Sequence, residues 1–457
     1  MLVRNYPIAG KKASEIVATI EEGIRAGRLR TGERLPAVRA LAAELGLSPG
    51  TVAAAYATLK TRGLVTARGR QGSRVSFRPP LAAPESRRVA TRPAASRAAA
   101  ARVDPRVGAR RLDDGNPDPR LLPPLRPALR RVAARQRLYG EPQNLAELVV
   151  LARKQLAADR IAADHLTVVG GALDGIERAL GAHLRPGDRV AVEDPGFPGV
   201  LDLVSALGLV AEPVGVDDDG PLPEDLRVAL ARHAQALIVT PRAQNPTGAA
   251  FSEARVGELR HLLRAFPDTL LVEDDHAGPV AGAPPRTLSE RGRRRWAVVR
   301  SVSKSLGPDL RLAVLVGDAT TVSRVEGRRL VGSGWVSSIL QQAVVVLWSD
   351  NGTGERLREA AEVYAGRRRA LIAALAGHGI EAHGRSGMNV WIPVREESEL
   401  VERLRDAGWA VLGGERFRLV SPPALRVTVS RLEPRDADLF ARDLGHALEA
   451  QRLTRRP

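Results

Sequence analysis

Isoleucine recurs every fourth residue from Ile16 to Ile24, which is the spacing of one face of a helix. A helix that begins near Ser14 and buries this face is therefore expected. Glycine and proline then interrupt the pattern, and apolar residues return at helical spacing from Val38 to Leu45, until Gly46 ends the run. The pattern thus predicts two helices in this stretch.

A third helix is expected directly after this turn. Ser48 is a suitable N-cap because its hydroxyl oxygen accepts a hydrogen bond from a backbone N–H, and apolar residues continue to Leu59. Two helices joined by a tight turn form a helix-turn-helix, whose second helix enters the major groove of DNA. Residues 63–66 and 67–75 then predict two short strands joined by a glycine- and arginine-rich turn, which is typical of a wing.

Beyond residue 111 short apolar strands alternate with helical stretches. This alternation is typical of α/β architecture with a mostly parallel sheet, in which ligands bind beyond the strand ends. The predicted strands are residues 167–169, 189–192, 236–240, 270–272, 297–301 and 313–316. From about residue 350, helical spacing over 361–375 and strands over 389–394 and 426–430 predict a small C-terminal α/β part.

The distribution of charge also divides the chain near residue 111. Residues 1–111 carry 22 Lys and Arg against 7 Asp and Glu, whereas the rest of the chain is nearly neutral. A basic module attached to a neutral body favours binding to a polyanion such as DNA. Residues 77–111, rich in proline, alanine and arginine, are predicted to be a linker, either a solvated tether or a stretch that follows DNA phosphates.

These patterns predict four parts: a winged helix over 1–76, the linker over 77–111, a large domain over 112–349 and a small subdomain over 350–457. The longest apolar run, Ala343 to Trp348, is too short to span a membrane, and no signal peptide is evident, so a cytoplasmic protein is expected. Cysteine is absent, which excludes disulfides and thiolate metal sites, and no metal is predicted.

Lysine is scarce, with five lysines against 64 arginines in the chain. Lys304 follows a predicted buried strand, within Ser301–Lys304. Arginine does not form a Schiff base, whereas a primary amine condenses with an aldehyde, and desolvation and nearby cations make it more nucleophilic. Lys304 is therefore the candidate for covalent chemistry, with a purely structural role as the alternative.

Pyridoxal 5'-phosphate, an aldehyde cofactor, also needs an anion beside its pyridine nitrogen, a donor to its phenolic oxygen, phosphate donors and a stacking surface. Residues at predicted strand ends supply each of these groups. The candidates are Asp274 for the anion, Asn245 for the donor, Phe197 for stacking, and Ser301, Arg311 and the helix-opening backbone of Gly170–Leu173 for the phosphate.

Residues 10–76 resemble the GntR family of winged-helix regulators. The resemblance depends on the stretches Gly32–Ser48 and Tyr56–Val65. It implies DNA contacts by Arg39 on the second helix, by Ser48 and Thr51 where the third helix enters the groove, and by Arg68 and Arg70 in the wing.

The recognition helix departs from that family, which often has arginines where this chain has Pro49 and Ala53. Arginine bridges guanine with two hydrogen bonds and proline does not. Specificity is therefore expected to depend on Arg39, the wing and the shape of the DNA. A salt bridge to a neighbouring helix is the alternative role of Arg39.

Residues 112–447 resemble the aspartate-aminotransferase superfamily of fold type I, because the motifs around Phe197, Asn245, Asp274 and Lys304 occur in the family's order. Together with the GntR-like head, the chain resembles the MocR-type regulators. The resemblance implies a Schiff base at Lys304 and an ion pair between Asp274 and the pyridine nitrogen. It further implies a cofactor site that includes Asn245, His276, Ser301, Ser303, Arg311, Phe197, Gly171, Ala172, Leu173 and Tyr139.

The same resemblance implies that Arg426 binds the carboxylate of a substrate or effector. It also implies a head-to-tail homodimer in which Tyr139 reaches the phosphate of the neighbouring subunit. Three positions depart from the family: His276 stands where Tyr is usual, and Asn144 and Val149 stand where Gly and Arg are common. These departures favour cofactor binding over efficient turnover.

The leading hypothesis is a transcriptional regulator that binds double-stranded DNA and senses pyridoxal phosphate, alone or as an adduct with a small amino compound. Function would then be switching, through different ligand contacts in two states. An active aminotransferase with an appended DNA-binding domain is the alternative, and a regulator that has lost the cofactor and only dimerises is a third.

Overall fold

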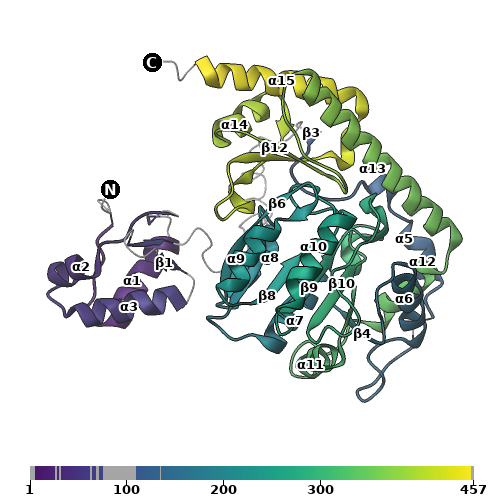
Figure 1. The fold of residues 1–457 in the computed structure, drawn as a ribbon, viewed down its shortest axis with the longest axis horizontal. Helices are drawn as coiled ribbons and strands as arrows, with labels where there is room; N and C mark the ends of the chain where they lie inside the picture. Colours follow the sequence, from purple (N-terminus) through teal and green to yellow (C-terminus); the bar gives the residue numbers. More distant parts are fainter. Residues whose placement is uncertain are drawn as a thin grey trace, which may run out of the picture. The chain divides into compact units, whose positions relative to one another are not determined.

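The computed structural model describes residues 6–25, 28–29, 32–61, 64–67, 72–75, 110–133 and 135–453. Within these residues the chain forms a small N-terminal unit and a large unit, each with its own buried core (Figure 1). No helix of this part of the chain is long and apolar enough to cross a bilayer.

The N-terminal unit is a winged helix. Its elements are α1 (Ala13–Arg25), α2 (Val38–Leu45), α3 (Pro49–Thr61), β1 (Val65–Ala67) and β2 (Ser73–Val75). The predicted isoleucine face of α1 is buried, with Ile16 and Ile20 fully enclosed against residues of α3 such as Leu59. The strands β1 and β2 pair antiparallel, as expected of a wing.

The turn between α2 and α3 has the predicted chemistry. Gly46 ends α2 in the left-handed region, at φ 67°, and its N–H bonds back to the last turn of that helix. Ser48 begins α3 as expected, because its Oγ accepts from the N–H of Thr51 at 3.1 Å. The two helices are therefore held in the short connection that defines a helix-turn-helix.

The large unit is built on an eight-stranded sheet of order β4-β11-β10-β9-β8-β5-β6-β7. The strands are β4 (His165–Val169), β5 (Arg189–Asp194), β6 (Val210–Asp217), β7 (Gly220–Pro221), β8 (Ala234–Val239), β9 (Leu270–Asp275), β10 (Trp296–Ser301) and β11 (Ala313–Gly317). The four central strands β5, β8, β9 and β10 run parallel, β11 runs antiparallel to them, and β4, which pairs antiparallel with β11, runs in the same direction as the central strands. The predicted mostly parallel sheet is confirmed.

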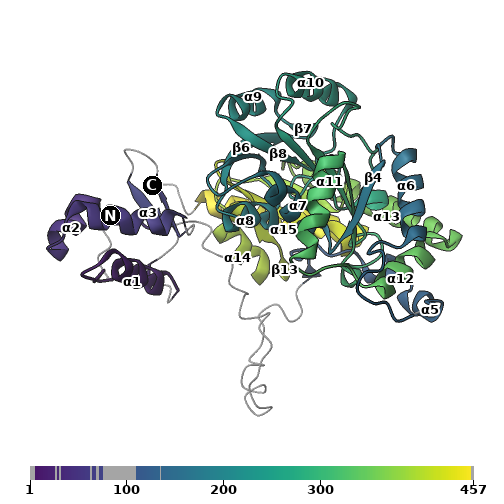
Figure 2. The ribbon, with the colours of Figure 1, turned by 90° about the horizontal axis from the view of Figure 1, so that it is seen from below.

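Helices cover both faces of the sheet, which is why its central strands are apolar on both sides (Figure 2). One buried cluster joins Val298 of β10 to α6 (Ala146–Ala158), α9 (Pro223–Ala231) and α10 (Glu253–Arg264). The next residue, Val299, points to the opposite face and lies under Gly175 of α7 (Ala172–His183). The remaining helices of this part are α5 (Leu125–Arg130), α8 (Pro198–Ala206), α11 (Ala319–Leu330) and α12 (Ser338–Trp348).

A small lobe follows α13 (Asn351–Gly377), the longest helix of the described residues. Its other elements are β12 (Asn389–Pro393), α14 (Ser398–Asp406), β13 (Trp409–Ala410), β14 (Leu412–Gly413), β15 (Ala424–Thr428) and α15 (Pro434–Leu453). The strands β12, β15 and β14 form an antiparallel sheet, and α13, α14 and α15 enclose an apolar core with it.

The predicted boundary at residue 111 needs a correction. Arg110–Arg111, the last residues of the predicted linker, form strand β3, which pairs parallel with β13. The next residue, Leu112, is buried in the core of the small lobe. The small lobe therefore includes a piece of chain that precedes the large domain in sequence, and residues 77–109 of the predicted linker lie outside the described residues.

Candidate functional site

The predicted site residues of the large unit gather where the parallel strands end. Asp274 lies near the end of β9, Ser301 ends β10, and Asn245 follows β8. The register pairs Asp274 with Val299 and Asp275 with Arg300, so β9 and β10 end at the same edge of the sheet. This edge is where a parallel α/β sheet binds ligands.

Lys304 is held at this edge by the turn that follows β10. Its Nζ donates to the backbone carbonyl of Gly115 at 2.7 Å. Burial lowers the pKa of the Lys304 ammonium, and the nearby positive charge of Arg426 lowers it further, against the opposing charges of Asp114 and Asp274. A lowered pKa makes the free amine, which is the nucleophilic form, more available near neutral pH.

Asp274 is a buried carboxyl group that lacks a partner. Only 3% of the residue is exposed, and its Oδ1 has no hydrogen-bond partner within the described residues. Burial, with smaller contributions from the carboxylates of Asp275 and Glu193, raises the pKa of Asp274 to about 7 against the opposing charge of Lys304. A buried carboxylate of this kind calls for a cationic donor. The N–H of a pyridinium ring is such a donor.

His276 lies beside this carboxyl, with its Nδ1 4.0 Å from Oδ2 of Asp274. Burial lowers the pKa of His276 to about 4, and the charge of Lys304 adds to the effect. The imidazole is therefore neutral at pH 7 and has one N–H to donate. Tyrosine at this position would offer one O–H, so the substitution keeps a single donor.

The opposite side of the site is suited to an oxyanion. Gly171 precedes α7 at φ 112°, and no side chain caps that helix, whose first amides include those of Ala172 and Leu173. Arg311 donates to the carbonyl of Gly170 at 3.1 Å, and a Cβ on Gly171 would lie only 2.9 Å from the Arg311 guanidinium. Glycine thus lets the cation approach the helix start.

Two serines extend this oxyanion-binding edge toward Lys304. The Oγ of Ser301 donates to the Oγ of Ser303 at 3.0 Å and accepts from its backbone N–H at 3.1 Å. The hydroxyls are thereby ordered in the turn that carries Lys304. The predicted phosphate donors from β10, from the loop before β11 and from α7 thus come together at the strand ends.

Arg426 of β15 is almost fully buried and faces the same site. One NH group donates to the backbone carbonyl of Asp113, another to Oδ1 of Asn245 at 3.4 Å, and the guanidinium stacks on Phe417 at 4.9 Å. Asn389 also donates to Oδ1 of Asn245, at 3.3 Å. Because the amide oxygen of Asn245 accepts both bonds, a ligand would meet its NH2 group.

The two predicted aromatic residues differ in their surroundings. Phe197 is half-buried in the turn after β5, where its ring lies against the first turn of α8. Tyr139 is 92% exposed, and its ring meets that of Trp335 edge to face at 5.4 Å. Tyr139 therefore points to solvent in the single chain.

Of the predicted DNA contacts, Arg39 is exposed on α2. Ser48 and Thr51 lie at the start of α3, where their hydroxyls bond each other at 2.9 Å. The predicted wing residues Arg68 and Arg70 lie outside the described residues.

A buried charge network beneath the site was missed by sequence reasoning. Asp275 accepts two hydrogen bonds from Arg242, at 2.8 and 2.9 Å, and one from Arg300 at 2.7 Å. Arg300 reaches Asp159 at 2.6 Å. Burial alone would raise the pKa of Asp275, but Arg300 and Arg242 outweigh it and hold this pKa far below its ordinary value. Only the acidic run Glu273–Asp275 hinted at such a network.

Comparisons with known proteins agree with this geometry. The sequence pattern of the family "Aminotransferase class I and II" matches residues 125–444, and that of "Bacterial regulatory proteins, gntR family" matches residues 12–75. The chain is 38% identical, over 96% of its length and 99% of the relative's, to the vitamin B6 salvage pathway transcriptional repressor PtsJ of Salmonella typhimurium. It is 31% identical to the HTH-type transcriptional regulator TauR of Rhodobacter capsulatus, over 87% of this chain and 88% of TauR.

The fold has close counterparts among solved structures. A kynurenine aminotransferase of Pyrococcus horikoshii superposes with a TM-score of 0.68 at 21% identity, over 75% of this chain and 91% of that one. The LysN α-aminoadipate aminotransferase of Thermus thermophilus gives a TM-score of 0.66 at 22% identity, over 76% and 94%. At this identity the likeness establishes the aminotransferase fold.

Proposed function

Because this chain belongs to the MocR-type regulators, in which a GntR winged helix is joined to an aminotransferase class I and II domain, we propose that it is a DNA-binding transcriptional regulator that senses pyridoxal 5'-phosphate. The large unit is the sensor, and the winged helix binds double-stranded DNA. The name of the PtsJ relative, a vitamin B6 salvage repressor, supports a vitamin B6 compound as the effector.

The observation that carries the cofactor assignment is the buried Oδ1 of Asp274, which has no hydrogen-bond partner among the described residues, while the half-buried amine of Lys304 lies at the same edge. When bound, pyridoxal phosphate supplies an aldehyde that condenses reversibly with a primary amine. Lys304 is the amine, and Asp274 accepts from the pyridinium N–H. Asn245 and His276 donate toward the phenolic oxygen.

The other groups bind the phosphate and order the ring. Arg311, the hydroxyls of Ser301 and Ser303 and the first amides of α7 hold the phosphate. Phe197 stacks on the ring, and Arg426 binds a carboxylate of an amino compound joined to the cofactor.

Absorbance spectroscopy of the purified protein tests this proposal. Addition of pyridoxal phosphate is expected to produce the visible absorbance band of a Schiff base, and Lys304→Ala is expected to abolish it. Lys154→Ala, which changes an exposed lysine of α6, is the matched control and should keep the band. A band of equal strength in Lys304→Ala would rule out the assignment of the amine.

A homodimer is also proposed. Large apolar side chains stand exposed around a hollow lined by residues 135–143 and 330–339. They are Leu138, Tyr139, Leu330, Val331 and Ile339, with exposures from 47% to 92%. Monomeric proteins rarely leave such a group uncovered, and a second copy would cover it. In that dimer Tyr139 reaches the partner's cofactor site.

An active aminotransferase is the second candidate, favoured by the presence of Lys304, Asp274 and Arg426 at one site. Sustained transfer of an amino group to a keto acid would establish it. A single half-reaction that stops after one equivalent of amino acid would leave sensing as the function.

A further inference from the structure

Residues 113–115 lie across the two cationic groups of the proposed cofactor site. The carbonyl oxygen of Asp113 accepts from Arg426, and that of Gly115 accepts from Nζ of Lys304 at 2.7 Å. Arg426 is almost fully buried, and Lys304 is half-buried. The backbone of this segment therefore occupies the donors that a cofactor and a carboxylate would use. We call residues 113–115 the carbonyl latch.

Both sides of the latch are fixed to the small lobe. Before the latch, the carbonyl of Leu112 accepts from the N–H of Thr428 at 2.8 Å, and the N–H of Leu112 donates to the carbonyl of Ala410 at 2.9 Å. After it, the N–H of Asp118 donates to the hydroxyl of Tyr364 at 3.0 Å. The latch thus links the small lobe, which holds its ends, to Lys304 of the large domain.

Gly115 gives the latch its shape. Its φ is 65°, in the left-handed region, and a Cβ there would lie 3.3 Å from Arg426. Any other residue would be strained in this backbone conformation, and its Cβ would press on the Arg426 guanidinium. The closed latch therefore depends on glycine at this position.

Cofactor binding and the latch compete for the same atom. Condensation of the Lys304 ammonium with an aldehyde would form a C=N bond, and the aldehyde oxygen would leave as water with two of the three ammonium protons. The nitrogen would then keep one proton at most. The partly buried carbonyl of Gly115 would lose this donor, and the loss of the hydrogen bond weakens the closed latch.

We propose that pyridoxal phosphate releases the carbonyl latch, and that this release is the step by which the cofactor site signals toward the DNA-binding domain. This inference depends on the proposed function. The latch follows β3 directly, and β3 is the first described element after residues 76–109, which connect it in sequence to the winged helix. An effector carboxylate at Arg426 displaces the carbonyl of Asp113 in the same way.

Hydrogen–deuterium exchange of the full-length protein tests the latch. The hydrogen-bonded backbone amides beside the latch, those of Leu112, Asn116 and Asp118, should exchange slowly in the cofactor-free wild type and at least tenfold faster after addition of pyridoxal phosphate. Lys304→Ala should exchange fast without any cofactor, because the donor to Gly115 is gone, whereas Lys154→Ala should behave as wild type. Slow exchange in Lys304→Ala, or no change in a wild type that has gained the Schiff-base absorbance, would overturn the latch alone.

A second variant tests signalling. Gly115→Ala without cofactor should bind DNA with an affinity within about twofold of cofactor-loaded wild type. Gly292→Ala is the matched control, because Gly292 is an exposed glycine at φ 91° with nothing near its Cβ position. DNA binding of Gly115→Ala that equals cofactor-free wild type would overturn the signalling step. A wild type that binds no pyridoxal phosphate would overturn the proposed function and this inference together.

Discussion

Asp274 and Asp275 are adjacent buried carboxyl groups whose pKa values are shifted in opposite directions, upward for Asp274 and downward for Asp275. Asp275 lies between two arginines, whereas Asp274 has an oxygen without a partner among the described residues. Alternate residues of β9 point to opposite faces of the sheet, so one carboxyl faces the cofactor site and the other the network beneath it. Asp274 therefore has a binding role, and Asp275 has a structural role.

Asparagine substitutions should separate these roles in the cofactor-free protein. Asp275→Asn leaves Arg242 and Arg300 with the half-buried Asp159 as their remaining counter-charge and should destabilise the fold by about 3 kcal/mol. Asp274→Asn removes an unpaired buried carboxylate and should not destabilise it, while weakening binding of pyridoxal phosphate at least tenfold. Urea unfolding and cofactor titration measure the two effects.

The raised pKa of Asp274 predicts how the stability of the folded protein depends on pH. Burial raises the pKa of Asp274 to about 7 from its ordinary 3.8. Between about pH 4 and 7 this carboxyl is ionised in the unfolded chain but protonated in the folded protein. The free energy of unfolding therefore falls as pH rises through this range. Above pH 7 Asp274→Asn should exceed wild type in unfolding free energy by on the order of 4 kcal/mol, and below pH 4 the two should agree. Equal stabilities at pH 8 would contradict the raised pKa.

Side-chain chemistry made part of the site predictable. Lys304 stands out because lysine is scarce, and Asp274 and Asn245 stand out because each follows an apolar strand. The carbonyl latch was not predictable, because backbone carbonyls leave no signature in the sequence. Arg242 and Arg300 were hidden among 64 arginines.

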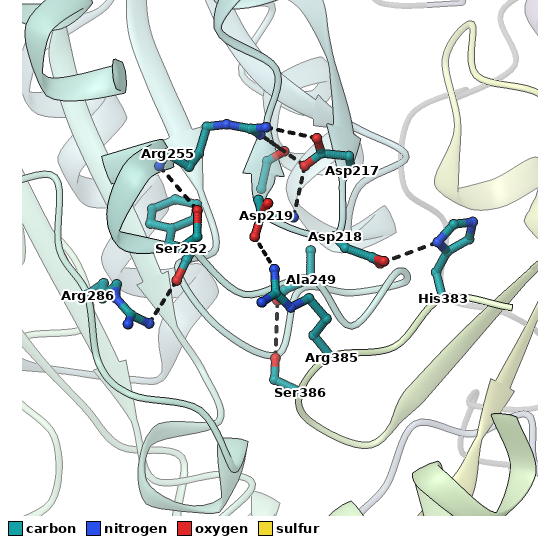
Figure 3. Close-up of polar contacts among 12 residues, drawn as sticks. Asp217, Asp218, Asp219, Ala249, Ser252, Arg255, Arg286, His383, Arg385 and Ser386 are labelled. Carbon is teal, nitrogen blue, oxygen red and sulfur yellow. Dashed lines mark hydrogen bonds and ion pairs between the residues drawn. The ribbon is translucent and has the colours of Figure 1, made fainter. Parts of the chain in front are cut away.

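At the scale of elements, the two lobes of the large unit meet at a polar junction (Figure 3). Asp217 ends β6, Asp218 and Asp219 form the turn to β7, and the small-lobe segment 383–386 faces this turn. His383 pairs with Asp218 at 3.3 Å, Arg385 pairs with Asp219, and Ser386 donates to the carbonyl of Ala249 at 3.2 Å. This junction is distinct from the carbonyl latch and holds the lobes together independently of Lys304.

The junction should weaken as pH rises. The hydrogen bond to Asp218 raises the pKa of His383 above its ordinary 6.5, against partial burial, and Glu381 at 3.4 Å adds a second negative charge. The contribution of protonated His383 is therefore complete below pH 6.5 and is lost as pH rises through the raised pKa. The protection factors of the amides of residues 383–386, which correct for the intrinsic pH dependence of exchange, should fall over this range in wild type but not in His383→Gln. Wild-type protection factors that do not change with pH would contradict the prediction.

Strand periodicity predicted the central elements better than the peripheral ones. All six predicted strands are present, because strands buried on both faces are continuous apolar runs. Strand β6 was missed because Glu212 and Pro213 interrupt its pattern near the sheet edge, and β3 was missed because its two residues are arginines in a basic stretch. Tertiary pairing, rather than local sequence, defines β3.

At the scale of the whole molecule, nearly all of the net positive charge belongs to residues 1–111, which contain the winged helix. Phosphate neutralisation releases counterions from DNA, so this asymmetry assigns DNA affinity to the N-terminal part and leaves the large unit to sense a small molecule. Coupling between the two requires that the ligand bind two states of the protein with different affinity.

The exposed apolar group around Tyr139 belongs to this scale, because the proposed dimer would cover it. Val331 is 89% exposed and Leu330 is 71% exposed at the end of α11. Val331→Asp should leave the fold of one chain intact and shift the protein toward monomer at least tenfold in dissociation constant, as measured by sedimentation equilibrium. Val228→Asp, at an exposed valine of α9, is the control. A Val331→Asp protein with unchanged mass in solution would contradict this interface.

The central claim is that pyridoxal phosphate bound through Lys304 changes DNA binding. Its most direct measurement is the affinity of the full-length protein for a duplex that the protein itself selects from random sequence, with and without the cofactor, at one salt concentration. The DNA affinity of wild type should change at least fivefold on addition of pyridoxal phosphate, and that of Lys304→Ala should not change. Equal affinities for cofactor-loaded and cofactor-free wild type would contradict the account.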